Sequence, residues 1–217
     1  MIHKKKLCVI LILIMFLSSC IGVKADIVMR QNGSGSIELE YRLSRLAETL
    51  GKLDGNEHLP IIPIGKIDFE RTVARIEGLR LQSFSTRNDG KDTINTVKLE
   101  FTNPEVLVRF LSAVRQSAVL TQDQRKYSLS MSLTSGNSNI DPDLLALFTT
   151  VSEGYSVNIS LTAPRTATLA LFDSRKTPLT NVSGITLVPN GRKVSFLSPL
   201  GTLFTYSNGL GVEILWE

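Results

Sequence analysis

The chain contains 217 residues, of which 42% are hydrophobic and 20% charged, and this length is sufficient to bury a hydrophobic core. Its formal net charge of +4 falls to about +1 without Lys4, Lys5 and Lys6, which excludes a general electrostatic attraction to nucleic acid. Beyond residue 20 there is no cysteine and a single histidine, His58, which excludes a cysteine–histidine nucleophile and a zinc site with several histidines.

The first element in the chain is a short apolar segment that follows the three lysines. The apolar stretch from residue 7 to residue 17 has eleven residues, whereas a helix that crosses a bilayer needs about 20. A basic start, a short apolar core and small residues after the core are typical of a secretory signal peptide. We therefore predict that residues 1–19 are a signal peptide and that the protein is exported.

The end of this segment, Leu17-Ser18-Ser19-Cys20, resembles the lipobox of bacterial lipoproteins. The resemblance implies that the Cys20 thiol receives a diacylglycerol, that signal peptidase II cuts before Cys20, and that the new amino group can also be acylated. Two or three acyl chains are sufficient to hold a protein at a membrane. The residue after Cys20 is Ile21 rather than aspartate, which by the sorting rule of enteric bacteria favours the outer membrane over the inner one.

Two other interpretations of the N-terminus stay open. The sequence Val23-Lys24-Ala25 has the pattern of an ordinary cleavage site, and a cut there would leave a soluble protein that begins at Asp26. An uncleaved membrane anchor is the other alternative, although the short apolar core disfavours it.

The first half of the mature chain is predicted to alternate between strands and helices. Residues 20–25 are expected to be a lipidated tether, followed by the single folded domain, residues 26–217. Alternating apolar and polar residues predict strands, a 3.6-residue apolar period predicts helices, and Asp89-Gly90 predicts a hairpin turn. The predicted elements are strands at 27–30 and 37–43, helices at 43–53 and 68–78, strands at 79–86 and 93–101, and a helix that Asn103 caps.

The second half is predicted to be richer in strands. A serine-rich strand at 127–133 precedes a helix that begins at Asp141 and ends at Gly154, and a strand follows at 155–163. Shorter strands are expected near 167–172, 182–188, 192–197 and 210–216.

These elements predict an α+β fold with antiparallel sheets and helices on one face. From residue 36 to 134 the order is strand, helix, strand, strand, helix, strand, which is the order of a ferredoxin-like βαββαβ unit. A β-rich C-terminal extension follows it. A division into two parts near residues 135–141 is the alternative to a single domain.

One apolar segment, residues 59–64, lies outside these predicted helices and strands. Pro60 and Pro63 interrupt it, so it is predicted to be a loop that packs in the core, closes over a ligand or contacts a partner. Its apolar residues, which we take as candidate ligand or partner contacts, are Leu59, Ile61, Ile62 and Ile64.

No pattern in the sequence predicts catalysis. Glu38 and Glu40 share a strand face with Arg42, which favours a solvated surface over a catalytic pair of carboxylates. Asp141 and Asp143 are better explained as helix-start residues than as calcium ligands, because no complete calcium loop surrounds them. We therefore predict no catalytic residues, no metal and no cofactor.

Two further features of the chain are the glycine-rich turn Asn32-Gly33-Ser34-Gly35 with the strand after it, and the β-rich end from Pro199 to Trp216. In these features the body of the chain resembles LppM-type lipoproteins. The resemblance implies a lipid-anchored α+β domain of the bacterial envelope, and it supplies no settled catalytic activity that could be carried over to this chain. Together these observations predict a non-catalytic envelope lipoprotein that binds a lipid, a glycolipid or an envelope protein. A structural or surface-exposed lipoprotein without a ligand, and a hydrolase that uses aspartate, glutamate or serine, are the alternatives.

Overall fold

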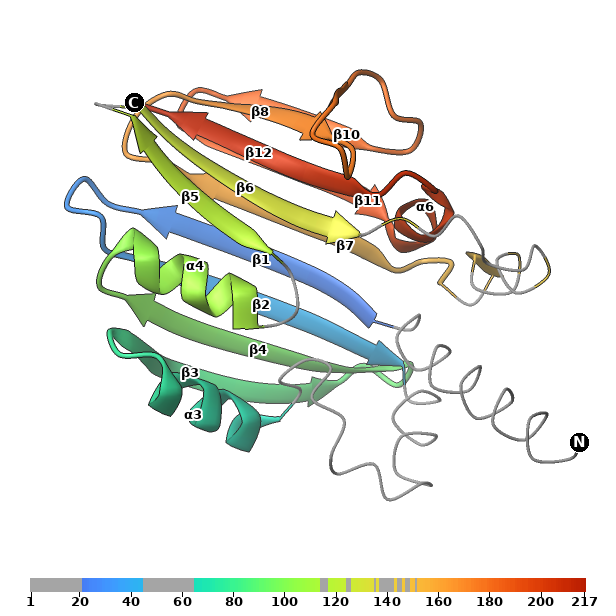
Figure 1. Ribbon diagram of the computed structural model, residues 1–217. Coiled ribbons are helices and arrows are strands. Elements are labelled where there is room, and N and C mark those ends of the chain that lie inside the picture. Colours follow the sequence, from blue (N-terminus) through green and yellow to red (C-terminus); the bar gives the residue numbers. More distant parts are fainter. Residues whose placement is uncertain are drawn as a thin grey trace, which may run out of the picture.

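The computed structural model describes residues 21–44, 65–113, 117–123, 126–134 and 152–217, together with residues 136, 143, 146, 149 and 150. Two sheets form the body of the protein (Figure 1). The larger sheet has seven strands in the order β10-β11-β7-β1-β2-β4-β3, and the smaller has five in the order β5-β6-β12-β8-β9. The helices α3, α4 and α6 accompany them, so the α+β prediction is confirmed.

The seven-stranded sheet is mostly antiparallel. Its strands are β1 (Ile21–Met29), β2 (Gly35–Ser44), β3 (Leu79–Asn88), β4 (Asp92–Phe101), β7 (Ser156–Thr162), β10 (Thr186–Asn190) and β11 (Lys193–Pro199). The exception is the pair β1 and β7, which run parallel with Val23 opposite Val157. The strands of this sheet have two ends along the strand direction. We call the one at which β1 begins the Ile21 end.

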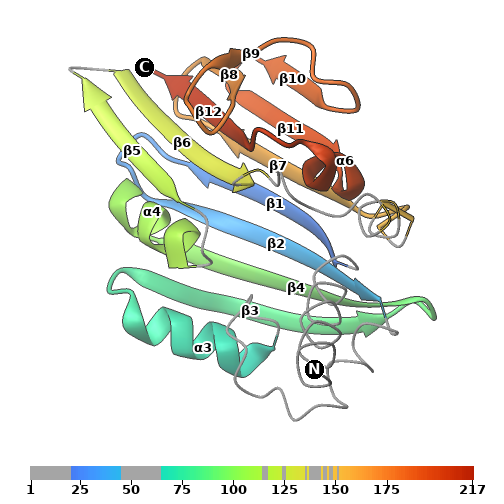
Figure 2. The same cartoon turned by 45° about the vertical axis from the view of Figure 1, so that its right-hand side comes forward.

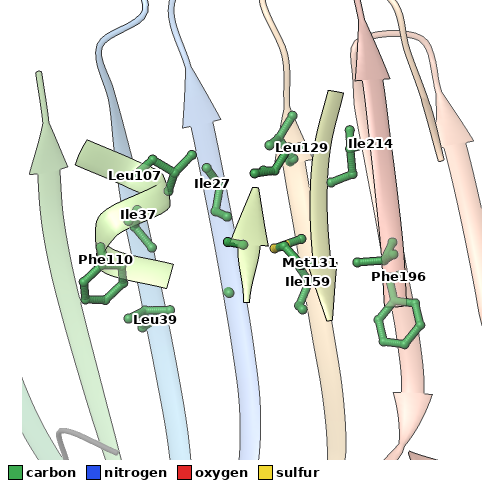
Figure 3. Close-up of a cluster of buried hydrophobic side chains, with 14 of the residues drawn as sticks. Ile27, Ile37, Leu39, Leu107, Phe110, Leu129, Met131, Ile159, Phe196 and Ile214 are labelled. Carbon is green, nitrogen blue, oxygen red and sulfur yellow. The ribbon is translucent and has the colours of Figure 1, made fainter. Parts of the chain in front are cut away.

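The five-stranded sheet lies over one face of the larger sheet. It contains β5 (Ala118–Asp123), β6 (Lys126–Thr134), β8 (Ala167–Phe172), β9 (Pro178–Leu179) and β12 (Leu210–Trp216). Side chains from both sheets meet in one core, in which Ile27 and Ile37 face Leu129 and Met131 (Figure 3). These buried residues fill the space between the sheets, and the two sheets therefore belong to one packed body.

Helices α3 (Lys66–Arg75) and α4 (Pro104–Ala113) cover the same face of the larger sheet as the smaller sheet does (Figures 1 and 2). Phe69 of α3 is fully buried, and its ring lies 5.9 Å from that of Tyr41 and 6.0 Å from that of Phe84. In α4 the Asn103 side chain accepts a hydrogen bond of 3.0 Å from the Val106 amide, as predicted for its cap. The short helix α6 (Leu200–Thr205) follows β11.

The ferredoxin-like unit is correct for its first three strands and wrong for the fourth. Strands β2, β4 and β3 lie side by side in that unit's arrangement, with Leu39 opposite Val97. The fourth strand of the unit should lie next to β2, but β1 occupies that place. The predicted strand 127–133 is part of β6, which lies in the other sheet. The reason is the tight turn at residues 30–34, where Gly33 has a φ of 81° and the Asn32 side chain accepts from the Ser34 amide at 3.1 Å. That turn makes β1 the local partner of β2.

The expected tether is also different in the structure. Residues 21–25 are the first half of β1, with Ile21 opposite Leu43 and Ala25 opposite Leu39. Alternation explains the difference, because Val23, Ala25 and Ile27 point toward the core while Lys24 and Asp26 point away from it. The strand therefore extends to the residue that follows Cys20.

Candidate functional site

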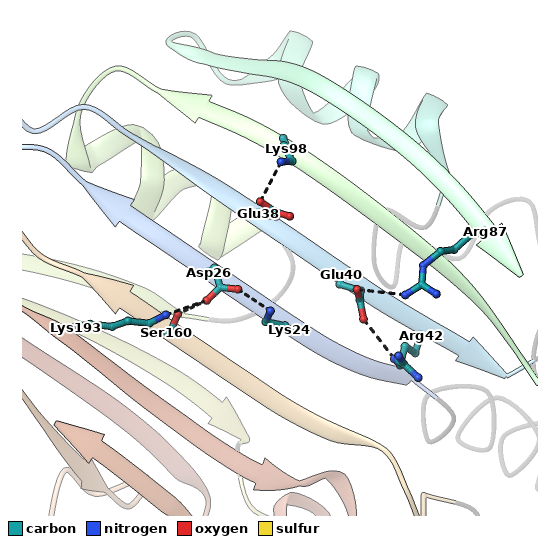
Figure 4. A network of polar contacts seen from close by, with 9 residues as sticks. All are labelled: Lys24, Asp26, Glu38, Glu40, Arg42, Arg87, Lys98, Ser160 and Lys193. Atoms are coloured by element: carbon teal, nitrogen blue, oxygen red, sulfur yellow. Dashed lines mark hydrogen bonds and ion pairs between the residues drawn. The ribbon is translucent and has the colours of Figure 1, made fainter. Parts of the chain in front are cut away.

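The open face of the seven-stranded sheet carries the most organised polar groups in the described part of the chain. These groups occupy the outward positions of neighbouring strands, opposite the buried positions that form the core. We call this surface the charged face (Figure 4); it consists of Lys24, Asp26, Glu38, Glu40, Arg42, Arg87, Lys98, Ser160 and Lys193.

Asp26 is the centre of one half of the charged face. Its carboxylate lies 3.1 Å from the Lys24 ammonium and 3.8 Å from that of Lys193, and it accepts a short hydrogen bond from the Ser160 hydroxyl. Partial burial favours the neutral form, but the Ser160 hydroxyl and the Lys24 ammonium outweigh it and lower the pKa of Asp26. The hydrogen bond between the Lys24 ammonium and the Asp26 carboxylate also raises the pKa of Lys24. Asp26 is therefore an anion at neutral pH rather than a proton donor.

Glu40 is the centre of the other half. Its carboxylate lies 3.3 Å from the Arg42 guanidinium and 3.8 Å from that of Arg87, while Glu38 lies 3.2 Å from the Lys98 ammonium. The interpretation of Glu38, Glu40 and Arg42 as one solvated surface is confirmed, because their side chains share an exposed face and pair with cations. Carboxylates held in this way suit binding more than acid–base chemistry.

We expect Asp26→Asn to lower the free energy of unfolding by about 1 kcal/mol at pH 7, because a charge-assisted hydrogen bond and a partly exposed ion pair are lost. The folded-state pKa of Asp26 is lowered, so this contribution is present above the unfolded pKa of about 4 and disappears as the pH falls through the folded value. Urea unfolding at pH 7 and near pH 3 measures the effect. Glu38→Gln is the control, because its exposed pair with Lys98 should contribute less. An equal difference between wild type and Asp26→Asn at both pH values would contradict the assignment.

A shallow depression of about 490 Å³ lies on the charged face beside Asp26. Lys24 and Lys193 border it with ammonium groups that are about half exposed and that retain donors beyond the Asp26 contact. Two carboxylates, Asp26 and Glu38, also line it. Its other lining groups are an amide, several hydroxyls, three exposed apolar side chains and one buried isoleucine: Asn158, Ser160, Thr162, Thr186, Ser195, Val28, Val188, Leu197 and Ile27. Cations, hydroxyls and apolar surface side by side can hold an anionic group that is joined to an apolar one.

Most of the residues that were singled out as candidate sites from the sequence lie outside the described residues. This applies to the signal peptide 1–19, to Cys20 and the lipobox residues Leu17, Ser18 and Ser19, and to Leu59, Ile61, Ile62 and Ile64. It also applies to the predicted helix at 43–53 beyond Ser44, to His58 and Asp141, and to most of the predicted helix at 141–154. Their described neighbours are informative, because Ile21 and Ser44 both lie at the Ile21 end of the seven-stranded sheet.

Sequence reasoning missed several members of the charged face, among them Lys24, Asp26, Ser160 and Lys193. The alternation in residues 23–28 could have placed Lys24 and Asp26 on a strand face. The contacts of Asp26 with Ser160 and Lys193 join residues more than 130 positions apart, and no local pattern shows that pairing.

Within the described ranges there is no cluster of three or more histidine, cysteine, aspartate or glutamate residues that could hold a metal ion. None of the helices that the structure describes has both the length and the apolar character needed to cross a membrane.

No family model and no curated protein matches this chain. Among solved structures, the chain is similar to the NMR structure of the folded domain of LppM from Mycobacterium tuberculosis. The two have a TM-score of 0.42 and 11% sequence identity, and the match covers 83% of this chain and 90% of the LppM domain.

Proposed function

We propose that this protein is a non-catalytic lipoprotein of the bacterial envelope, anchored by acyl chains on Cys20. The observation that carries the proposal is the position of β1, which begins at the residue after Cys20 and lies between β2 and β7. The alternative cut after Ala25 would remove more than half of this strand, including the buried Ala25 and the Lys24 partner of Asp26. A cut before Cys20 leaves the strand whole, which supports the lipobox.

The residue after the cysteine bears on the choice between the inner and the outer membrane. Ile21 rather than aspartate at this place favours the outer membrane in bacteria that sort lipoproteins by the enteric rule. We propose that location, with the acyl chains as the membrane contact.

We further propose that the protein binds a lipid or glycolipid head group at the depression beside Asp26. The space between the two sheets is filled by side chains such as Leu129, Met131 and Ile214, so an acyl chain would have to displace well-packed residues there. The depression instead offers ammonium groups of Lys24 and Lys193 next to hydroxyls and exposed apolar side chains. An envelope protein is the alternative occupant of the same surface.

The apolar residues Leu59, Ile61, Ile62 and Ile64 are proposed as a second contact surface. The segment that contains them begins after Ser44, and Ser44 and Leu43 lie at the end of β2 that pairs with the start of β1. It therefore starts on the side of the domain where the anchor joins, and apolar contacts near a bilayer or a partner are favourable.

Native mass spectrometry of the full mature protein, purified in detergent from bacterial membranes, tests the binding proposal. We expect a bound phospholipid or glycolipid in the wild type. In the double variant Lys24→Gln/Lys193→Gln we expect binding that is weaker by about a hundredfold or more, since each of the two lost charge-assisted contacts contributes about 1.5 kcal/mol or more. Lys98→Gln is the control, because it removes a cation from the same face that does not itself line the depression. Its partner Glu38, which does line the depression, stays in place. Wild-type protein without any bound lipid, or a double variant that retains it fully, would contradict the proposal.

A further inference from the structure

The start of β1 leaves no free chain between the predicted lipid and the folded body. This inference rests on the lipid anchor proposed above. Ile21 directly follows the acylated cysteine, and the Cα atoms of consecutive residues are only about 3.8 Å apart. Ile21 is already paired with Leu43 of β2, and Gly22 with Arg42.

The first residues of β1 are paired with β2, and from Val23 onward the strand is also paired with β7. Val23 pairs with Val157 of β7, and a Cβ on Gly22 would touch the Tyr155 ring at 3.4 Å. The Tyr155 hydroxyl donates a buried hydrogen bond of 2.7 Å to Asp92, and the Tyr155 carbonyl accepts one of 2.9 Å from the Leu200 amide. Tyr155, which lies beside the start of β1, is thus hydrogen-bonded to β4 and to the start of α6, and β1 itself is paired with β2 and β7. A segment held in this way cannot act as a hinge.

β1 is the fourth of seven strands, with three strands on each side of it. An anchor at its start therefore joins the middle of the sheet and not one of its edges. At the same end lies the turn between β3 and β4, which extends past the level of Ile21 because Asp92 pairs with Ser44, one residue beyond Leu43 (Figure 2). The exposed Lys91 lies in this turn, with its ammonium 5.5 Å from the centre of the Tyr155 ring.

We propose that the domain is seated directly on the bilayer at its Ile21 end, with the β3–β4 turn against the lipid head groups and the strands of the larger sheet directed away from the membrane. The opposite end, with the turn at residues 30–34, is then about 30 Å from the head groups, because β1 has nine residues that rise about 3.3 Å each. The charged face stands upright beside the membrane, and Lys24 lies about 10 Å above Ile21 along the strand.

Site-specific fluorescence tests this orientation with the full lipidated protein. The mature chain has no cysteine other than the acylated Cys20, so an introduced cysteine provides one labelling site. Lys91→Cys places the label in the β3–β4 turn, and Gln31→Cys places it in an exposed turn at the opposite end. The labelled proteins are inserted in vesicles of phosphatidylethanolamine and phosphatidylglycerol that contain a lipid with a nitroxide on its head group.

We expect the label at position 91 to lose most of its fluorescence to the nitroxide and the label at position 31 to lose little. A flexible Gly/Ser insertion of about ten residues between Cys20 and Ile21 spans roughly 17 Å, and it should abolish the difference between the two labels. Vesicle-bound protein with equal quenching at both positions, or an insertion without effect, would overturn the seated orientation. Failure of the acylated protein to form, or to remain on the vesicles, would instead overturn the anchor on which the inference rests.

Discussion

Replacing Cys20 by alanine is expected to abolish incorporation of radiolabelled palmitate and to release the protein from the membrane fraction. Acyl chains contribute about 0.8 kcal/mol per buried methylene, and two or three chains together hold a protein firmly at a bilayer. In the proposal these acyl chains supply the whole membrane attachment. The variant should therefore change from membrane-bound to unbound rather than bind somewhat less.

Cys8→Ala is the matched control for this experiment, because Cys8 lies in the predicted signal peptide and is removed with it. This variant should incorporate palmitate as the wild type does. Equal labelling of Cys20→Ala and wild type would contradict the anchor, as would membrane retention of Cys20→Ala after a wash at high salt and high pH.

Phe69→Ala is expected to lower the free energy of unfolding by about 3–5 kcal/mol, which is a large part of the stability of an ordinary domain. Phe69 is fully buried and joins α3 to the sheet through the rings of Tyr41 and Phe84. Burial also raises the pKa of Tyr41, in agreement with its place in this apolar cluster. Urea denaturation followed by circular dichroism gives the difference.

Ile67→Ala provides the comparison on the same helix. Ile67 is 61% exposed, so its truncation should cost well below 1 kcal/mol. Similar losses for Phe69→Ala and Ile67→Ala would show that α3 does not pack on the sheet as described.

Much of the secondary structure could be predicted because its signals are local. Alternation gave β2, β4 and β6, the Asn103 cap gave the start of α4, and Asp89-Gly90 gave the β3–β4 turn. Other elements have weak local signals. Strand β5 (Ala118–Asp123) has two apolar positions that pack and a polar end, and α6 has neither a side-chain cap nor a charged turn. Both were missed.

The pairing of strands that lie far apart in the sequence could not be predicted in the same way. The parallel contact of β1 with β7 joins residues more than 130 positions apart, and the transfer of β6 to the second sheet depends on packing between sheets. The candidate site also depends on this long-range pairing of strands. Asp26 is recognisable as an outward residue of a strand, but its contacts with Ser160 and Lys193 exist because β1, β7 and β11 lie side by side.

Intact mass analysis of the mature protein from the envelope fraction tests the central claim most directly. A chain that begins at Cys20 and carries the added mass of a diacylglycerol, alone or with one further acyl group, is the expected result. A chain that begins at Asp26, or one in which Cys20 is unmodified, would contradict the lipid anchor and the direct seating of the domain on the membrane.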